Sequence, residues 1–245
     1  MNSLYGTALS SVLAPSGAGI VLESLADQIH RILLRRIIDG QLPPGSRINV
    51  PLLAKEFGTS KTPIREALNR LEFDHFVVTK QRSGSYVRQP TMEDVDEICE
   101  FRKAIEWLCT GLATGRISDE RLHELRAEVV EAERIANEDG DFAPFFRSDE
   151  NLHGTIVEVT GNQRIIQVRR TSEPYLEWIR VLGATGTHRL EVSTMRHLQI
   201  IDAMLEGDAE RAQAVAALHV DEVQRFTKED FSGSLVNFSE ATGRR

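Results

Sequence analysis

Apolar residues recur at helical spacing along most of this 245-residue chain. Residues 21–39 carry them every three or four positions, and Gly40 ends that predicted helix. Two shorter helices follow within residues 50–71, joined by a tight turn at Gly58. The second of these has an apolar stripe on one side and polar residues on the other. The stripe consists of Ile64, Ala67, Leu68 and Leu71.

One short segment breaks the helical pattern. Residues 76–79 and 85–87 are β-prone, and they flank residues 80–84, which contain two cations and Gly84. This arrangement predicts a hairpin with a cationic tip. A hairpin directly after the second helix of a helix-turn-helix is the wing of a winged helix.

After Pro90 the helical spacing returns and continues almost to the end of the chain. Thr91 is expected to cap the first of these helices, and five residues of this helix are expected to face inward. These residues are Ile98, Phe101, Ile105, Leu108 and Leu112. Six helices are expected in all: 91–114, 119–137, 141–160, 164–182, 188–206 and 209–228. The predicted fold is therefore mainly α, a winged helix-turn-helix of three helices and a two-stranded wing, followed by an antiparallel bundle of six or seven helices.

The same pattern predicts how the chain divides. Residues 1–20 read as a flexible N-terminal arm, and residues 21–90 as the winged helix-turn-helix domain. Residues 91–232 form the all-α domain. Residues 233–245 are rich in Gly, Ser and Thr and are expected to be a flexible tail.

Charge is unevenly distributed along the chain. The net charge of −8 divides into +4 for residues 21–90 and −12 for residues 91–245. A cationic first domain is compatible with nucleic acid despite the acidic total. No apolar run approaches the roughly 18–20 residues of a membrane span, so no membrane is expected. Cys99 and Cys109 fall on one predicted helix, roughly 15 Å apart, which excludes a disulfide and favours the cytoplasm.

The exposed side of the second short helix is the expected DNA surface. Lys61, Arg65 and Asn69 lie one turn apart opposite the apolar stripe, where they can meet phosphates and base edges. Ser60 or Thr62 can cap this helix. The expected DNA-binding residues are Arg47, Ser60, Lys61, Thr62, Arg65, Arg82 and Gly84.

Four polar residues interrupt apolar faces in the second domain. Asp149 and His153 are spaced i, i+4 and project side by side, while His197 and His219 each replace an apolar residue on another helix. One buried histidine is usually a hydrogen-bonded core residue. Three with an aspartate indicate a divalent metal, because burying an ionised carboxylate is costly without compensation. Zinc, nickel, iron and manganese all suit this set. A solvated or capping role is expected for the other histidines, His30, His75, His123 and His188.

The first domain resembles the GntR family of bacterial transcription regulators. The resemblance rests on residues 38–48, 60–68 and 84–87, in that order. It implies a winged helix that binds DNA. Two positions depart from the family: His75 stands where glycine is more common, so the turn before the wing is expected to differ. Lys61 replaces a common arginine and so loses bidentate reading of guanine.

The second domain resembles the effector domain of the FadR subfamily within that family. The resembling segments are 102–106 and 149–153, the dipeptide Gly161-Asn162, and His197 and His219. In the metal-binding branch an Asp, a His one turn on and two later His surround a divalent ion. The resemblance implies that open metal positions receive a small organic acid, with Arg102 available to pair with its carboxylate. An intramolecular ion pair with Glu106 is the alternative role for Arg102.

The expected function is therefore that of a ligand-responsive transcriptional repressor. A homodimer is expected because a palindromic operator requires two recognition helices about one DNA turn apart. A metalloenzyme is the rival interpretation, but no separate general base, nucleophile motif or phosphate-binding loop accompanies the metal set, so no enzyme activity is expected. A third interpretation makes the metal itself the signal, or purely structural.

Overall fold

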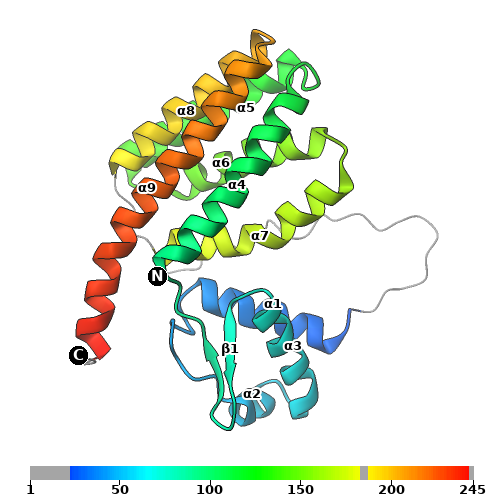
Figure 1. The fold of residues 1–245 in the computed structure, drawn as a ribbon, viewed down its shortest axis with the longest axis vertical. Helices are drawn as coiled ribbons and strands as arrows, with labels where there is room; N and C mark the ends of the chain where they lie inside the picture. The colour runs from blue at the N-terminus through cyan, green and yellow to red at the C-terminus, as the bar shows by residue number, and fades with distance from the viewer. Residues whose placement is uncertain (1–22, 183–186, 243–245) are drawn as a thin grey trace, which may run out of the picture. The chain divides into compact units, whose positions relative to one another are not determined.

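The computed structural model describes residues 23–182 and 187–242, and this part of the chain forms nine helices and one two-stranded sheet. These elements fall into two compact units, α1–α3 with the sheet and α4–α9 (Figure 1). The mainly α fold predicted from the sequence is confirmed. In chain order the elements are α1 (Leu25–Ile38), α2 (Val50–Glu56), α3 (Lys61–Phe73), β1 (Val77–Lys80), β2 (Gly84–Val87), α4 (Met92–Ala113), α5 (Asp119–Asp139), α6 (Ala143–Val159), α7 (Gln163–Leu182), α8 (Thr187–Leu205) and α9 (Ala209–Thr242).

The helix-turn-helix is formed by α2 and α3. Asn49 caps α2, and its side chain accepts a hydrogen bond of 3.0 Å from the amide of Leu52. Gly58 turns the chain with a left-handed φ of 61°, which glycine adopts without strain. Ser60 occupies the N-cap of α3 but its hydroxyl makes no capping hydrogen bond there. The predicted apolar stripe of α3 is buried: Ile64, Ala67, Leu68 and Leu71.

The wing is an antiparallel hairpin in which Lys80 lies opposite Gly84. The first strand lies one residue later than predicted and the second begins one residue earlier, so Lys80 and Gly84 pair instead of belonging to the tip. Arg82 takes a left-handed φ of 61° in the three-residue turn. An isolated bridge between Arg47 and Tyr86 adds the chain before α2 to the same hairpin. Strand β2 is therefore bridged on both sides, by β1 and by Arg47.

The turn before the wing keeps a conformation that suits glycine. His75 adopts a φ of 65°, and its Nδ1 lies 3.0 Å from Nη1 of Arg88. A residue with a Cβ is strained in the left-handed region by roughly 1–2 kcal/mol. The histidine therefore carries the strain of a backbone conformation that suits glycine, and the expectation that the turn differs from the family stays a prediction.

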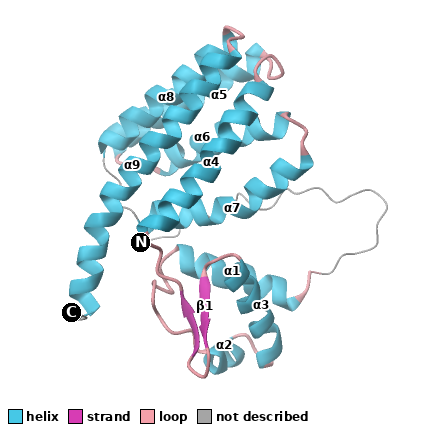
Figure 2. Ribbon diagram, in the orientation of Figure 1, coloured by secondary structure: helices cyan, strands magenta, loops and turns pink. Residues whose placement is uncertain are grey.

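The second unit is a bundle in which α4 runs beside α9 and α8 runs along the other side of α9 (Figures 1 and 2). Helix α5 packs on α6 and α8. Thr91 starts α4 with a capping box completed by Asp94, as the sequence predicted for the cap. Apolar residues from α4 to α9 share one core, whose largest fully buried members include Leu122, Leu125, Leu152 and Ile200.

The inward face of α4 differs from the prediction. Leu108 and Leu112 are 39% and 37% exposed, whereas Arg102 and Glu106 are buried. The helix is rotated so that an ion pair between those two charged residues faces the bundle. The prediction was wrong for Leu108 and Leu112, because it counted only apolar residues as inward and left out the charged pair. The buried residues of α4 are Asp94, Val95, Cys99, Arg102, Glu106, Cys109, Thr110 and Ala113.

The sequence also predicted a flexible segment at each end of the chain. Helix α9 runs to Thr242, well beyond the predicted end at Lys228 and into the segment expected to be a flexible tail. The predicted arm, residues 1–20, lies outside the described residues, as do 243–245. Among the described helices none combines the length and apolar character needed to cross a membrane.

Candidate metal centre

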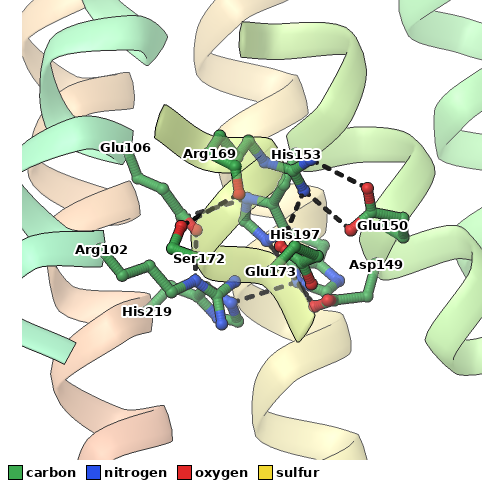
Figure 3. A network of polar contacts seen from close by, with 10 residues as sticks. All are labelled: Arg102, Glu106, Asp149, Glu150, His153, Arg169, Ser172, Glu173, His197 and His219. Atoms are coloured by element: carbon green, nitrogen blue, oxygen red, sulfur yellow. Dashed lines mark hydrogen bonds and ion pairs between the residues drawn. The ribbon is translucent and has the colours of Figure 1, made fainter. Parts of the chain in front are cut away.

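Three helices bring the four predicted ligands together. Helix α6 supplies Asp149 and His153, α8 supplies His197, and α9 supplies His219 (Figure 3). One ligand atom from each residue lies within 4.8 Å of every other, and all four side chains are buried. The sequence could place Asp149 beside His153, but only the packing of the bundle adds the other two.

The distances within the cluster suit a shared cation. Nε2 of His197 lies 3.3 Å from Nε2 of His153, 3.3 Å from Nε2 of His219 and 3.2 Å from Oδ1 of Asp149. Nε2 of His153 lies 3.7 Å from the same Asp149 oxygen. Ligands about 2.0–2.1 Å from a tetrahedral ion are roughly 3.3 Å apart. The four residues could therefore hold one divalent ion between them.

Burial keeps two of the histidines in the form that binds metal. Removal from water lowers the pKa of His197, despite the opposing charge of Asp149. Burial also lowers the pKa of His219 well below its ordinary value, and the neighbouring imidazoles add to that shift. A neutral imidazole has a lone pair to donate, so these histidines are ready to coordinate near neutral pH.

A buried carboxylate contacts the cluster from α4. Oε2 of Glu106 lies 3.0 Å from Nδ1 of His153, on the far side of the ring from the other ligands. Its other oxygen pairs with Nε of Arg102. Burial alone would raise the pKa of Glu106, but Arg102 and His153 hold that pKa well below its usual range. Oε2 of Glu106 makes no hydrogen bond in this geometry, but its negative charge beside Nδ1 favours the His153 tautomer with its proton on Nδ1 and Nε2 available.

Helix α7 contributes a second arginine–carboxylate group (Figure 3). Both terminal nitrogens of Arg169 lie 2.8 Å from the two carboxylate oxygens of Glu150, and Glu173 is 3.4 Å away. Sequence reasoning missed Arg169 and the contact of Glu106 with His153, because charged residues on amphipathic helices read as solvated. The i, i+4 spacing of Arg102 and Glu106 could indicate their ion pair, but it could not indicate the contact of Glu106 with His153.

A small cavity opens beside the cluster, within the second unit. The cavity is tight, with a volume of about 10 Å³. The lining residues come from α4, α6, α8 and α9: Arg102, Phe145, Phe146, Asp149, Arg189, Ser193 and Val223. Arg102 therefore faces both Glu106 and this cavity. The structure shows the ion pair of Arg102 with Glu106, and the expected contact of Arg102 with an effector stays a prediction.

None of His30, His75 and His123 belongs to the cluster. Nε2 of His30 is 3.2 Å from a carboxylate oxygen of Asp74, His75 forms the turn before the wing, and His123 is exposed. The side chain of His188 lies outside the described residues.

In the first unit, the predicted DNA-binding side chains are exposed on α3 and the wing. Lys61 and Arg65 form no ion pair with any described residue, whereas Arg70 on the same helix pairs with Asp27. A Cβ added at Gly84 would lie 3.5 Å from Nε of Arg47, so the guanidinium of Arg47 lies close to the wing backbone. The unit therefore presents unneutralised cations on its recognition helix, which is the arrangement of a DNA-binding winged helix.

Comparison with known proteins agrees with both units. Residues 25–87 match the model of the "Bacterial regulatory proteins, gntR family", and residues 97–222 match that of the "FCD domain". The chain belongs to the GntR family of bacterial transcription regulators, and its FCD domain fits the FadR-type subfamily.

Named relatives cover most of the chain. The uncharacterized HTH-type transcriptional regulator YdhC of Bacillus subtilis is 29% identical, over 78% of this chain and 86% of its own. The HTH-type transcriptional repressor RspR of Escherichia coli is 24% identical, over 82% and 88%. The probable D-xylose utilization operon transcriptional repressor of Paenarthrobacter nicotinovorans is 28% identical, over 80% and 86%. These relatives place the chain among transcription regulators.

Solved structures share the fold. E. coli McbR/YncC superposes with a TM-score of 0.66 at 21% identity, covering 86% of this chain and all of that chain. A GntR regulator from Rhodococcus sp. RHA1 gives 0.65 at 22%, covering 83% and 97%. At this identity the likeness concerns architecture alone.

Proposed function

We propose that this regulator is a homodimeric repressor whose FCD domain binds one divalent metal ion and a small carboxylate effector. The observation that carries the proposal is the buried cluster of three histidines and Asp149 beside a cavity that Arg102 lines. A cluster of this kind is costly to bury without a cation. The sequence and the geometry support the same four ligands independently.

The metal would be held by Asp149, His153, His197 and His219. Their mixed nitrogen and oxygen set suits zinc, nickel, iron or manganese. When bound, the ion would offer positions for an acid oxygen. Within the chain, Arg102 would orient the acid by pairing with its carboxylate from the cavity wall, and Phe145 would limit the access of water.

DNA binding would run through α3 and the wing. Ser60, Thr62 and Arg65 are exposed near the start of α3, next to Lys61. Arg47, Arg82 and Gly84 would carry the phosphate contacts of the wing. Effector binding in the FCD domain would favour one arrangement of the two winged helices over another and thereby change operator affinity. A regulator of this kind acts where the DNA lies, in the cytoplasm.

Dimer formation would occur through the outer face of the bundle. Each chain has one recognition helix, whereas a palindromic operator has two half-sites. Trp107, Leu108 and Leu112 on α4 and Leu218 on α9 are all more than a third exposed. A second copy would remove this apolar surface from water.

The geometry argues against the enzyme alternative. A hydrolytic metal site requires a general base near the metal-bound water. Among the described residues, the carboxylates next to the ligands already have partners: Glu106 contacts Arg102 and His153, and Glu150 pairs with Arg169. We therefore assign the cluster to ligand binding and no enzyme activity to the chain. A metal-sensing regulator with no organic effector is the alternative.

Elemental analysis tests the metal. Purified full-length protein is expected to carry about one divalent ion per chain, and the His153→Ala/His197→Ala variant almost none. Chelation should lower the melting temperature of the wild type, because a ligand that binds only the folded state stabilises it. Equal and negligible metal in both proteins, with no thermal shift on adding zinc, nickel or manganese, would reduce the four residues to polar core groups.

A further inference from the structure

The first strand of the wing, β1, is held where it begins but exposed along the rest of its length. Phe76 and Val77 are buried, and the amide of Phe76 donates a hydrogen bond of 2.8 Å to the carbonyl of Leu71 in α3. The exposed residues of β1 are Val78, Thr79 and Lys80. Strand β2 lies between β1 and residues 45–48, which leaves the outer edge of β1 without a neighbouring strand in the described part of the chain. The position of these exposed residues relative to α3 therefore depends on contacts at that outer edge.

Glu72 makes such a contact from the last turn of α3. Its Oε1 accepts a hydrogen bond of 2.8 Å from the backbone amide of Thr79. The amide of Arg88 donates across the hairpin to the carbonyl of Phe76, so Phe76 turns its backbone groups toward β2. Successive residues of a strand turn theirs to opposite edges, which places the amide of Thr79, three residues on, at the outer edge. The carboxylate of Glu72 thus takes the place of a neighbouring strand.

The tip of the wing is ordered by contacts of its own. The hydroxyl of Ser83 lies 2.7 Å from that of Tyr86, and Nζ of Lys80 lies 5.1 Å from the centroid of the Tyr86 ring. Arg82 stands in the turn between them, which a hydrogen bond of 3.0 Å from the amide of Ser83 to the carbonyl of Lys80 closes. The tip is therefore preformed, and its direction relative to α3 depends on how β1 is held.

We propose that Glu72 is a positioning residue for DNA binding: by tying Thr79 to the recognition helix, it fixes the wing tip where Arg82 meets the duplex. This inference rests on the proposed function, in which α3 and the wing contact the same DNA. Two contacts held in one geometry bind more tightly than two joined loosely, because less conformational freedom is lost on binding. DNA repels the negative charge of Glu72, which favours a role in geometry over direct contact.

Two substitutions separate this role from the charge of Glu72. Glu72→Ala removes the charge and the acceptor, whereas Glu72→Gln removes the charge and keeps an acceptor oxygen. The probe is a palindromic duplex that the full-length wild type selects from a random DNA pool, and affinity is measured by gel shift. The loss of one hydrogen bond should make Glu72→Ala bind about three- to tenfold more weakly than Glu72→Gln. A purely electrostatic role would make the two variants equal.

Glu66 provides the matched control. It is exposed on the same helix and forms no hydrogen bond or ion pair with any described residue. Glu66→Ala and Glu66→Gln should therefore bind the duplex within about twofold of each other. Hydrogen exchange of the DNA-free proteins gives a second readout: residues 77–87 should exchange faster in Glu72→Ala than in Glu72→Gln.

The decisive comparison is made in an Arg82→Ala background. There the tip has lost its proposed DNA contact, so the difference between Glu72→Ala and Glu72→Gln should fall to about twofold or less. Equal affinities of these two variants in the otherwise wild-type protein would overturn the inference, as would a difference that persists undiminished without Arg82. Binding of Arg82→Ala as tight as that of the wild type would instead overturn the proposed contact of the wing with DNA, and this inference with it.

Discussion

Glu106→Gln is the substitution that most directly tests how the candidate metal centre is built. Glu106 offers two carboxylate oxygens, one to Arg102 and the other to Nδ1 of His153 at 3.0 Å. Glutamine has nearly the same volume but only one acceptor oxygen. If that oxygen faces His153, the amide NH₂ meets the donors of Arg102. In the other orientation His153 loses its acceptor.

The magnitude follows from this contact. Losing the outer partner of a metal-ligating histidine typically lowers metal affinity about 10–100-fold, or about 1.4–2.7 kcal/mol. We therefore expect the zinc dissociation constant of Glu106→Gln to rise by one to two orders of magnitude.

The assay is competition with a zinc-binding dye at pH 7.5, supported by nitrogen-15 NMR of the metal-free protein. In the wild type the His153 ring should carry its proton on Nδ1, and in Glu106→Gln it should exchange between tautomers. This NMR readout separates an effect on His153 from a general loss of stability. Stability will also fall, because Arg102 is left buried without its carboxylate.

Glu150→Gln is the matched control. It removes a carboxylate adjacent in sequence to Asp149, but Glu150 pairs with Arg169 and contacts none of the histidines. Its zinc affinity should therefore stay within about twofold of the wild type. A Glu106→Gln protein whose zinc affinity also stays within twofold would refute the reasoning, as would equal losses in both variants.

Further predictions concern the recognition helix, the turn, the pH response and the dimer. Arg65→Ala should weaken operator binding in gel shifts by roughly 1–3 kcal/mol, whereas Arg70→Ala, whose arginine is paired in the structure, should change it little. Replacing His75 by glycine should raise the free energy of unfolding by about 1 kcal/mol in urea titrations, because the left-handed strain is relieved. Folding lowers the pKa of His219, so below about pH 6.5 the unfolded chain binds a proton that the folded chain does not, and the folded state loses stability. The metal-free wild type should therefore lose more stability between pH 7.5 and 5.5 than His219→Gln. Leu112→Glu should shift sedimentation toward the monomer, and an unchanged dimer would contradict the assigned face.

Local spacing made much of the fold predictable. Each helix is indicated by apolar residues that recur with a period of about 3.6, and the β-prone segment after α3 interrupts that period. The stripe of α3 is buried as expected, because nearby residues on one helix face the same way whatever the rest of the chain does. The end of α9 was not predictable in this way, since glycine and serine near its end argued for a tail.

The candidate site was predictable in part for the same reason. His197 and His219 could be singled out because each is a polar residue on an otherwise apolar face. Their approach to Asp149 depends on how α6, α8 and α9 pack, which no local pattern contains. Arg189 gave no signal at all, because an arginine at the start of a helix is usually solvated.

The failure of the apolar pattern on α4 has a physical meaning. Leaving Leu108 and Leu112 more than a third exposed while burying Arg102 and Glu106 gives up part of the roughly 1.5–3 kcal/mol that each leucine gains on full burial. Positions where buried residues depart from the apolar pattern are commonly functional sites. Here Glu106 contacts the candidate metal ligand His153, and Arg102 lines the cavity. The exposed leucines lie on the opposite side of the same helix. If a second copy covers them, as proposed, α4 contacts the effector site with one face and the partner with the other. An acid that draws Arg102 away from Glu106 then acts on the helix that forms the dimer, so effector affinity and dimer geometry must be thermodynamically linked.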